Sequence, residues 1–196
     1  MRKLIIFIFF SLVIFINFAS AEGIVIGPKV GITYPLSSEA SGRYSSPWQN
    51  FGAFVRFEEG NFILQGEFEY LRSKTVLEFR GFLGRTYWST GGEVSYLATP
   101  FWLSLIAKIS FLQTGIGFGI YPVRENFEGG VAEDAWAYYY IANHSISDTF
   151  YGIQYILGIS NTHLALETKY SIVPTANRWG EIKNLGGVTV TLNAFF

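Results

Sequence analysis

Charged side chains recur at alternate positions within otherwise apolar segments of this chain. The set comprises Lys29, Arg56, Glu67, Glu69, Glu93, Glu167 and Lys169. Carboxylates gathered beside ammonium groups could form an ion pathway or a catalytic carboxylate cluster. They could equally pair with one another as a structural salt-bridge plug. The elements that carry these charges decide between the alternatives.

A second possible chemistry is nucleophilic catalysis, in which a histidine activates a serine and an acid orients the histidine. His163 lies in an expected short turn, away from the other candidates. We therefore expect both histidines of the chain to be solvated loop residues and no catalytic triad to form. The candidates are His144, Ser145 and Ser147, with Asp148 or Glu167 as the acid.

Composition excludes several other classes of site. The chain contains no cysteine, so it has no disulfide, no thiolate metal site and no lipidated cysteine. We find no zinc-ligand spacing or phosphate-binding loop, and Gly115-Ile116-Gly117 lies inside an expected strand rather than in a nucleotide-binding turn. We therefore expect no cofactor and no metal.

Residues 1–21 have the organisation of a cleaved secretory signal peptide. Arg2 and Lys3 precede an apolar run from Leu4 to Phe18, and Ala19-Ser20-Ala21 follows it. The run of 15 residues is shorter than the roughly 20 that a spanning helix needs. The segment holds two of the 14 basic residues and none of the 15 acidic ones, so the remainder has a net charge of −3. This leaves no basic excess for binding nucleic acid.

Residues 22–196 are expected to form one all-β domain. Apolar residues alternate with polar or small ones over eight segments, and no segment after residue 21 reaches the roughly 18 consecutive apolar residues of a spanning helix. In the fourth segment the alternation changes phase, which predicts a β-bulge near Pro100. The expected strands are 24–34, 48–57, 62–72, 93–105, 109–121, 149–159, a segment that ends at 172, and 186–196.

The expected connections alternate strictly in length. Long loops are predicted at 35–47, 73–92, 122–148 and 174–185, and tight turns at 58–61, 107–108 and 160–162. This alternation is typical of an antiparallel up-and-down membrane barrel, with both termini and the short turns on the periplasmic side. A soluble barrel would turn its charged face to water, whereas a membrane barrel turns that face inward.

Two further features favour the inward assignment of the charges. Glycines lie on the charged face, where a narrow interior requires small side chains. Tyrosines and tryptophans such as Tyr34, Trp48 and Tyr151 fall near the expected strand ends, as at a membrane interface. Since an eight-stranded barrel is just wide enough for side chains to fill, we expect a closed salt-bridge plug and no conducting pore. The glycines are Gly27, Gly31, Gly52, Gly115, Gly117, Gly119, Gly152 and Gly158.

The layout from Gly23 to Phe196 resembles the small eight-stranded outer-membrane β-barrel superfamily that includes the OmpA transmembrane domain, OmpX and the PorT-like proteins. The residues that carry the resemblance are 27–32, 96–100, 167–170 and the terminal strand 186–196. The resemblance implies an assembly signal at Leu192, Phe195 and Phe196, although Ala194 and Thr191 depart from the usual pattern of that signal. It also implies contact with the β-barrel assembly machinery and periplasmic chaperones, and with outer-membrane lipid and lipopolysaccharide.

The expected role is therefore that of a monomeric, non-enzymatic protein of the bacterial outer membrane. It would support the membrane or bind an external ligand through loops that carry Trp88, Trp136 and Tyr138-Tyr139-Tyr140. One alternative is a lipid A-modifying enzyme, but lipid A deacylases carry a His-x-Ser step, and residue 146 here is Ile while Ser147 is one position too far. Another alternative is a soluble, lipocalin-like periplasmic barrel.

Overall fold

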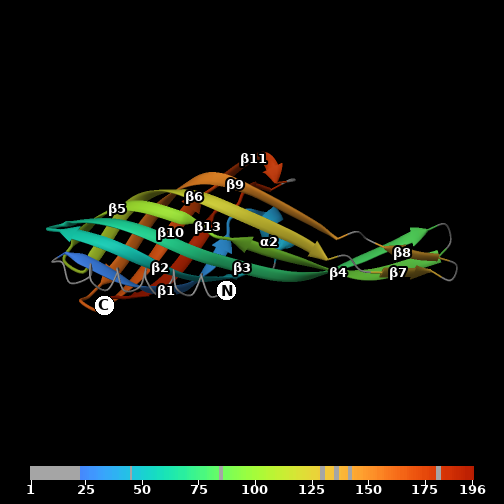
Figure 1. Cartoon of the computed structure of the whole chain (residues 1–196), viewed down its shortest axis with the longest axis horizontal. Coiled ribbons are helices and arrows are strands. Elements are labelled where there is room, and N and C mark those ends of the chain that lie inside the picture. Colours follow the sequence, from blue (N-terminus) through green and yellow to red (C-terminus); the bar gives the residue numbers. More distant parts are fainter. Residues whose placement is uncertain are drawn as a thin grey trace, which may run out of the picture.

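The backbone forms one closed antiparallel sheet (Figure 1). The structure, a computed structural model, describes residues 23–44, 46–83, 86–128, 131–134, 137–140, 143–179 and 182–196. The predicted signal peptide lies outside the described residues. The strands of the ring, in spatial order, are β1 (Ile24–Pro35), β2 (Trp48–Glu59), β3 (Phe62–Leu83), β4 (Thr86–Ala98) with β5 (Phe101–Ile109), β6 (Leu112–Glu128), β9 (His144–Ser160), β10 (Leu164–Ile172) and β13 (Gly187–Ala194).

The ring closes between the first and the last strand. β1 pairs with β2 on one side and with β13 on the other, and the β1–β13 register runs from Lys29 opposite Asn193 to Pro35 opposite Gly187. Closure leaves no free edge within the barrel, so its backbone hydrogen bonds are satisfied between strands. The predicted eight-stranded antiparallel barrel is confirmed.

β4 and β5 together form the fourth strand, and the predicted bulge near Pro100 is wrong. Both segments pair with β3 and β6 in one unbroken register: Ala98 lies opposite Leu71, and Phe101 lies opposite Phe68. Even-numbered residues face inward on both sides of Pro100. The apparent change of phase arose because apolar side chains of β4 face the interior, where the sequence pattern had placed polar ones.

One predicted short turn is also misplaced. Ala107 and Lys108 remain in β5, paired with Thr114 and Gln113, and the chain turns instead around Ser110, which has a φ of 59°. The turn between β2 and β3 lies within the predicted 58–61 segment, at Gly60, which has a φ of 58°. Glycine is favoured there because it has no Cβ to oppose a positive φ.

The four long connections contain more regular structure than predicted. β3 and β4 continue to Leu83 and Thr86, and β6 and β9 to Glu128 and His144, so that most of two expected loops is β-hairpin. Outside the barrel neither face of a strand has to be apolar, so apolar and polar residues alternate less regularly in these segments. The sequence pattern therefore did not reveal that the strands continue. The remaining elements are helix α2 (Ser38–Arg43), β7 (Val131–Asp134) paired with β8 (Ala137–Tyr140), and β11 (Pro174–Trp179) paired with β12 (Ile182–Asn184).

All these extensions leave the barrel at the end opposite the C-terminus. Figure 1 shows β7 and β8 well beyond the barrel, past the ends of β6 and β9. The tight turns lie at the other end, beside the C-terminus. The barrel therefore has a turn end and a hairpin end, as the alternating connection lengths predicted.

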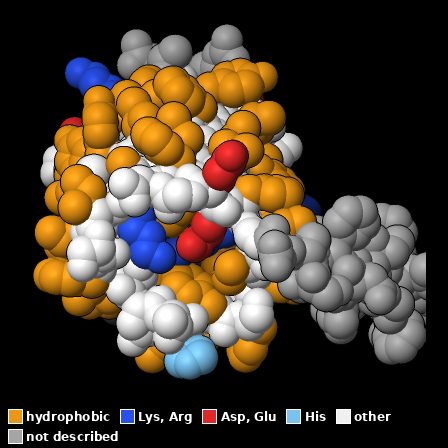
Figure 2. All heavy atoms as spheres, turned by 90° about the vertical axis from the view of Figure 1, so that its left-hand side faces the viewer, with side chains coloured by type: hydrophobic (Ala, Val, Ile, Leu, Met, Phe, Trp, Pro, Cys, Tyr) orange, Lys and Arg blue, Asp and Glu red, His pale blue; other side chains and the backbone are white. Residues whose placement is uncertain are grey.

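The faces of the sheet have inverted polarity. On β10, Leu166 and Tyr170 are exposed, whereas Glu167 and Lys169 between them are buried. Figure 2, viewed from the turn end, shows hydrophobic side chains around the outer wall and charged side chains within the mouth. No described helix is long and apolar enough to cross a membrane.

Candidate functional site

Six of the seven predicted charges meet inside the barrel. Their side chains project from β1, β2, β3 and β10, and each residue is at most 4 % exposed. The strand alternation places them there because each occupies an inward position between two outward residues, most of them apolar. We call this set the luminal ion-pair cluster: Lys29, Arg56, Glu67, Glu69, Glu167 and Lys169.

Glu67 lies at the centre of the cluster. Its carboxylate accepts hydrogen bonds from the ammonium groups of both Lys29 and Lys169. Lys29 also pairs with Glu69, and Lys169 Nζ lies 3.7 Å from Glu69 Oε1 and 3.3 Å from Glu167 Oε2. Two lysines thus bridge three carboxylates, and each charge has a counter-charge within ion-pair distance.

Arg56 completes the cluster on the turn side. Its guanidinium donates to Glu167 and to the side-chain oxygen of Gln65. The same group lies 5.0 Å from the ring centroid of Phe54 and 4.8 Å from that of Phe195. A buried cation is stabilised by both kinds of contact, since aromatic faces carry partial negative charge.

Uncharged polar side chains extend the cluster. Gln154 Nε2 donates to Ser104 Oγ at 3.0 Å and to Glu67 Oε1 at 3.3 Å. Asn50 Nδ2 donates to Glu69 Oε2 at 3.3 Å. The sequence prediction named charged residues alone. Gln154 and Asn50 also occupy inward positions on their strands, so the alternation could have identified them as neighbours of the charges.

The cluster contains three cations and three anions, so its formal charge is zero. Burial of ions is tolerated only when each is paired and hydrogen-bonded. The carboxylates are already engaged by lysine or arginine, which leaves none of them available as a general base. The arrangement suits charge compensation within a packed interior better than acid–base chemistry.

The inward prediction for Glu93 is wrong. Glu93 lies on the outer face of β4, where its side chain is 32 % exposed and its Oε2 lies 2.6 Å from Lys74 Nζ. Its neighbours Val94 and Tyr96 point inward instead. The reason is that the inward positions of β4 hold Val94 and Tyr96, which pack among other buried apolar side chains, so the rule that charges face inward does not apply to this strand.

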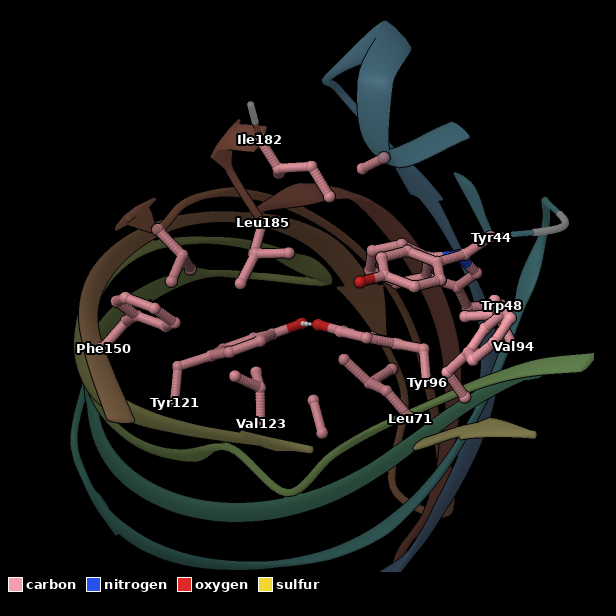
Figure 3. Close-up of a cluster of buried hydrophobic side chains, with 14 of the residues drawn as sticks. Tyr44, Trp48, Leu71, Val94, Tyr96, Tyr121, Val123, Phe150, Ile182 and Leu185 are labelled. Atoms are coloured by element: carbon pink, nitrogen blue, oxygen red, sulfur yellow. Dashed lines mark hydrogen bonds between the residues drawn. The ribbon is translucent and has the colours of Figure 1, made fainter. Parts of the chain in front are cut away.

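An aromatic layer lies in the lumen towards the hairpin end (Figure 3). Tyr96 and Tyr121 reach towards each other, and their hydroxyls lie 3.3 Å apart. The Tyr96 ring also contacts Tyr44 and Trp48, with ring centroids 4.6 and 4.7 Å apart. This layer was absent from the sequence prediction, which assigned aromatics to the outer wall.

Helix α2 is fastened over this layer. Arg43 donates two hydrogen bonds to Glu125, at 2.7 and 2.6 Å, and the Tyr44 hydroxyl donates a third at 2.5 Å. The hydrogen bonds to Glu125 raise the pKa of the Arg43 guanidinium above its ordinary value. Ala40 of the helix is fully buried. The first connection is therefore packed against the barrel end.

The residues considered for a catalytic triad show no catalytic arrangement in the described part of the chain. Ser145 is exposed, donates to Asn126 at 2.8 Å and accepts from Arg124 at 3.2 Å. Glu167 lies within the luminal ion-pair cluster. Asp148 accepts from the backbone N–H of Thr149 at 2.7 Å, and His163 lies in the turn before β10, at the opposite end. The side chain of His144 lies outside the described residues.

The predicted assembly-signal residues differ in exposure. Leu192 and Phe196 are exposed, whereas the Phe195 ring packs on Phe54 with centroids 5.6 Å apart. Among the described residues, no group of histidine or acidic side chains could hold a metal ion. The loop aromatics Trp88, Trp136 and Tyr138-Tyr139-Tyr140 have side chains outside the described part.

No protein-family model matches the sequence, and no curated protein matches it. Among solved structures, the chain is similar to the N-terminal β-barrel domain of Pseudomonas aeruginosa OprF, with 11 % identity and a TM-score of 0.41. It is also similar to Neisserial surface protein A, NspA, with 9 % identity and a TM-score of 0.47. Each match covers 89 % of this chain and 98 % of the other. The likeness concerns the fold alone, which the strand pairings establish by themselves.

Proposed function

We propose that this protein is an integral barrel of the bacterial outer membrane with a non-enzymatic, structural role. The observation that carries the proposal is the inverted polarity of the sheet. Large apolar side chains such as Phe51, Leu103 and Leu157 are at least half exposed, while the charges lie inside. A soluble protein rarely exposes a continuous apolar surface, because contact between apolar surface and water is unfavourable. The same apolar surface has no unfavourable contact with water when it lies in the hydrocarbon of a membrane.

The closed ring satisfies the second requirement of a membrane-spanning sheet. In hydrocarbon no water can bond to free backbone groups, so only helices and closed barrels span a bilayer. A soluble lipocalin-like barrel would carry its charges outside and an apolar cavity inside, the reverse of the observed faces. We place both termini and the turn end in the periplasm and the hairpin end outside, in agreement with the usual loop lengths of such barrels.

The luminal ion-pair cluster and the aromatic layer support a closed lumen. The six charges neutralise one another, and Tyr96, Tyr121, Trp48 and Trp102 fill the section beyond them. An eight-stranded barrel has an interior that side chains can fill completely. We therefore assign the interior a stabilising role rather than one in transport.

Reconstitution into lipid vesicles tests both parts of this proposal. We expect the refolded protein to float with the vesicles and to resist extraction by alkaline carbonate, because its apolar wall lies in hydrocarbon. In planar bilayers we expect no steady single-molecule conductance, because the lumen is filled. Release into plain buffer would refute the membrane location, whereas steady channel currents from an inserted protein would refute closure alone.

A second role, binding of an external macromolecule, is favoured by the projecting hairpins. β6 and β9 continue beyond the barrel and carry β7 and β8 at their far end (Figure 1). We expect that replacing residues 129–143 by a short Gly-Ser turn leaves barrel stability unchanged and abolishes capture of the external partner. Pull-down from envelope and surrounding fluid, with the full chain as the matched control, measures this. Equal capture by both proteins would place binding elsewhere.

A further inference from the structure

Six polar atoms on one side of the lumen, in its turn-side half, have no hydrogen-bond partner among the described residues. They belong to residues of β2, β3, β10 and β13 that are fully buried. Most buried polar groups in folded proteins have a partner, either protein or ordered water. The atoms are Arg56 Nη1, Gln65 Nε2, Glu167 Oε2, Thr191 Oγ1, and Asn193 Nδ2 and Oδ1.

These atoms belong to one connected part of the interior. Arg56 donates to both Gln65 and Glu167, which links β2 with β3 and β10. Glu167 lies directly opposite Thr191 in the β10–β13 ladder, and Asn193 follows two residues later on the same face of β13. Glu167 Oε2 lies 3.3 Å from Lys169 Nζ but accepts no hydrogen bond. We call this group the orphan polar cluster.

We propose that the orphan polar cluster binds a small group of ordered water molecules inside the barrel. The cluster contains both hydrogen-bond donors and acceptors. The unpartnered nitrogen atoms of Arg56, Gln65 and Asn193 are donors, and the unpartnered oxygen atoms of Glu167 and Asn193 are acceptors. The Thr191 hydroxyl can donate or accept. A ligand that satisfies such a mixed set must donate and accept at once. Water does both, and a buried water molecule commonly makes about three hydrogen bonds to otherwise unsatisfied groups.

The charge balance argues against an ion in this position. The three cations of the luminal ion-pair cluster already face three carboxylates. An added anion or cation would be buried without a counter-charge, which is unfavourable in a low-dielectric interior. The ligand is therefore small, neutral and polar. This inference does not depend on the location of the protein.

Removal of one hydroxyl from the cluster provides the thermodynamic test. Thr191→Val preserves the shape of the side chain but removes an atom that would bind water. We expect the folding equilibrium constant in urea titrations to fall about tenfold, because the bound water and its other partners lose a hydrogen bond. The matched control is Thr168→Val, the same change on the outer face of the neighbouring strand β10. We expect the control to change this constant less than twofold or to raise it.

A direct observation of water complements the variants. In the perdeuterated wild-type protein, we expect nuclear Overhauser cross-peaks between water and the side-chain amide protons of Asn193, with the sign of long-lived contact. If Thr191→Val changes the folding constant as little as Thr168→Val does, the proposal fails. Absence of the Asn193 cross-peak would overturn it whatever the variants show.

Discussion

Replacing Glu67 by glutamine is expected to lower the free energy of unfolding by about 3–5 kcal/mol. The change removes one negative charge that Lys29 and Lys169 share, and both ammonium groups are buried. Glu69 and Glu167 remain, but they would then have to balance three cations with two anions. The loss arises mainly from the uncompensated buried cation rather than from one missing hydrogen bond.

The matched control is Glu93→Gln, the same chemical change on the outer face. Glu93 pairs with Lys74, and both side chains are partly exposed, at 32 % and 52 %. Exposed pairs of this kind contribute at most about 1 kcal/mol, so the control is expected to change little. Urea-induced unfolding in lipid vesicles, followed by tryptophan fluorescence, measures both variants. Comparable losses for the two would mean that the luminal pairs are no stronger than surface pairs.

A double substitution distinguishes charge from packing. In Glu67→Gln combined with Lys169→Met, the lumen again contains equal numbers of cations and anions. We expect the double variant to recover a large part of the loss, because neighbouring charges in one network couple by about 0.5–3 kcal/mol. A double variant whose losses merely add would show that the side chains contribute through shape rather than charge.

The barrel itself was predictable because period-two alternation is a local signal. On β10, for example, four successive outward residues and the inward Glu167 and Lys169 specify the faces without reference to any other strand. Once the apolar face of a strand is assigned to the outside, every second residue of that strand faces inward. This determines which charges meet inside the barrel. This is why six of the seven charged positions are found together.

Glu93 shows where local parity was insufficient. The prediction treated the whole lumen as polar and therefore placed Glu93 inward. In the structure the interior changes character along the barrel axis, from the luminal ion-pair cluster to the aromatic layer. This change depends on which residues from distant strands lie at the same height along the barrel axis, as Tyr44 and Tyr121 do with Tyr96. The sequence of a single strand does not contain this information.

The hairpin end escaped prediction for a related reason. Beyond the barrel a strand no longer separates an interior from an outer wall, so the alternation that marks a strand is not required there. The hydrogen bond from Ala40 N–H to Ser37 and the anchoring of Arg43 by Glu125 likewise join residues that no periodic pattern connects. Sequence therefore predicts the walls of this barrel better than its ends.

Gly27→Ala is expected to prevent stable closure of the barrel, with a loss of about 3 kcal/mol or more, at or beyond the upper end of the usual range for overpacking. A Cβ at this position would lie 1.7 Å from the carbonyl oxygen of Ala194 and 3.0 Å from Phe54 Cζ. The first contact is with the backbone of the last residue of β13, so it can be relieved only by moving that end of β13 away from β1. Closure of the ring depends on the β1–β13 ladder.

Gly66→Ala is the matched control for this variant. Gly66 also lies within a strand, but a Cβ there would meet only Val55 Cγ1, at an ordinary 3.4 Å. Because alanine restricts the unfolded chain more than glycine does, the control is expected to be neutral or stabilising by up to about 1 kcal/mol. The folded fraction can be read from the mobility of unheated protein on SDS gels. Equal folding of the two variants would mean that the β1–β13 junction accommodates a methyl group, and that the glycine on the inner face is not required for closure.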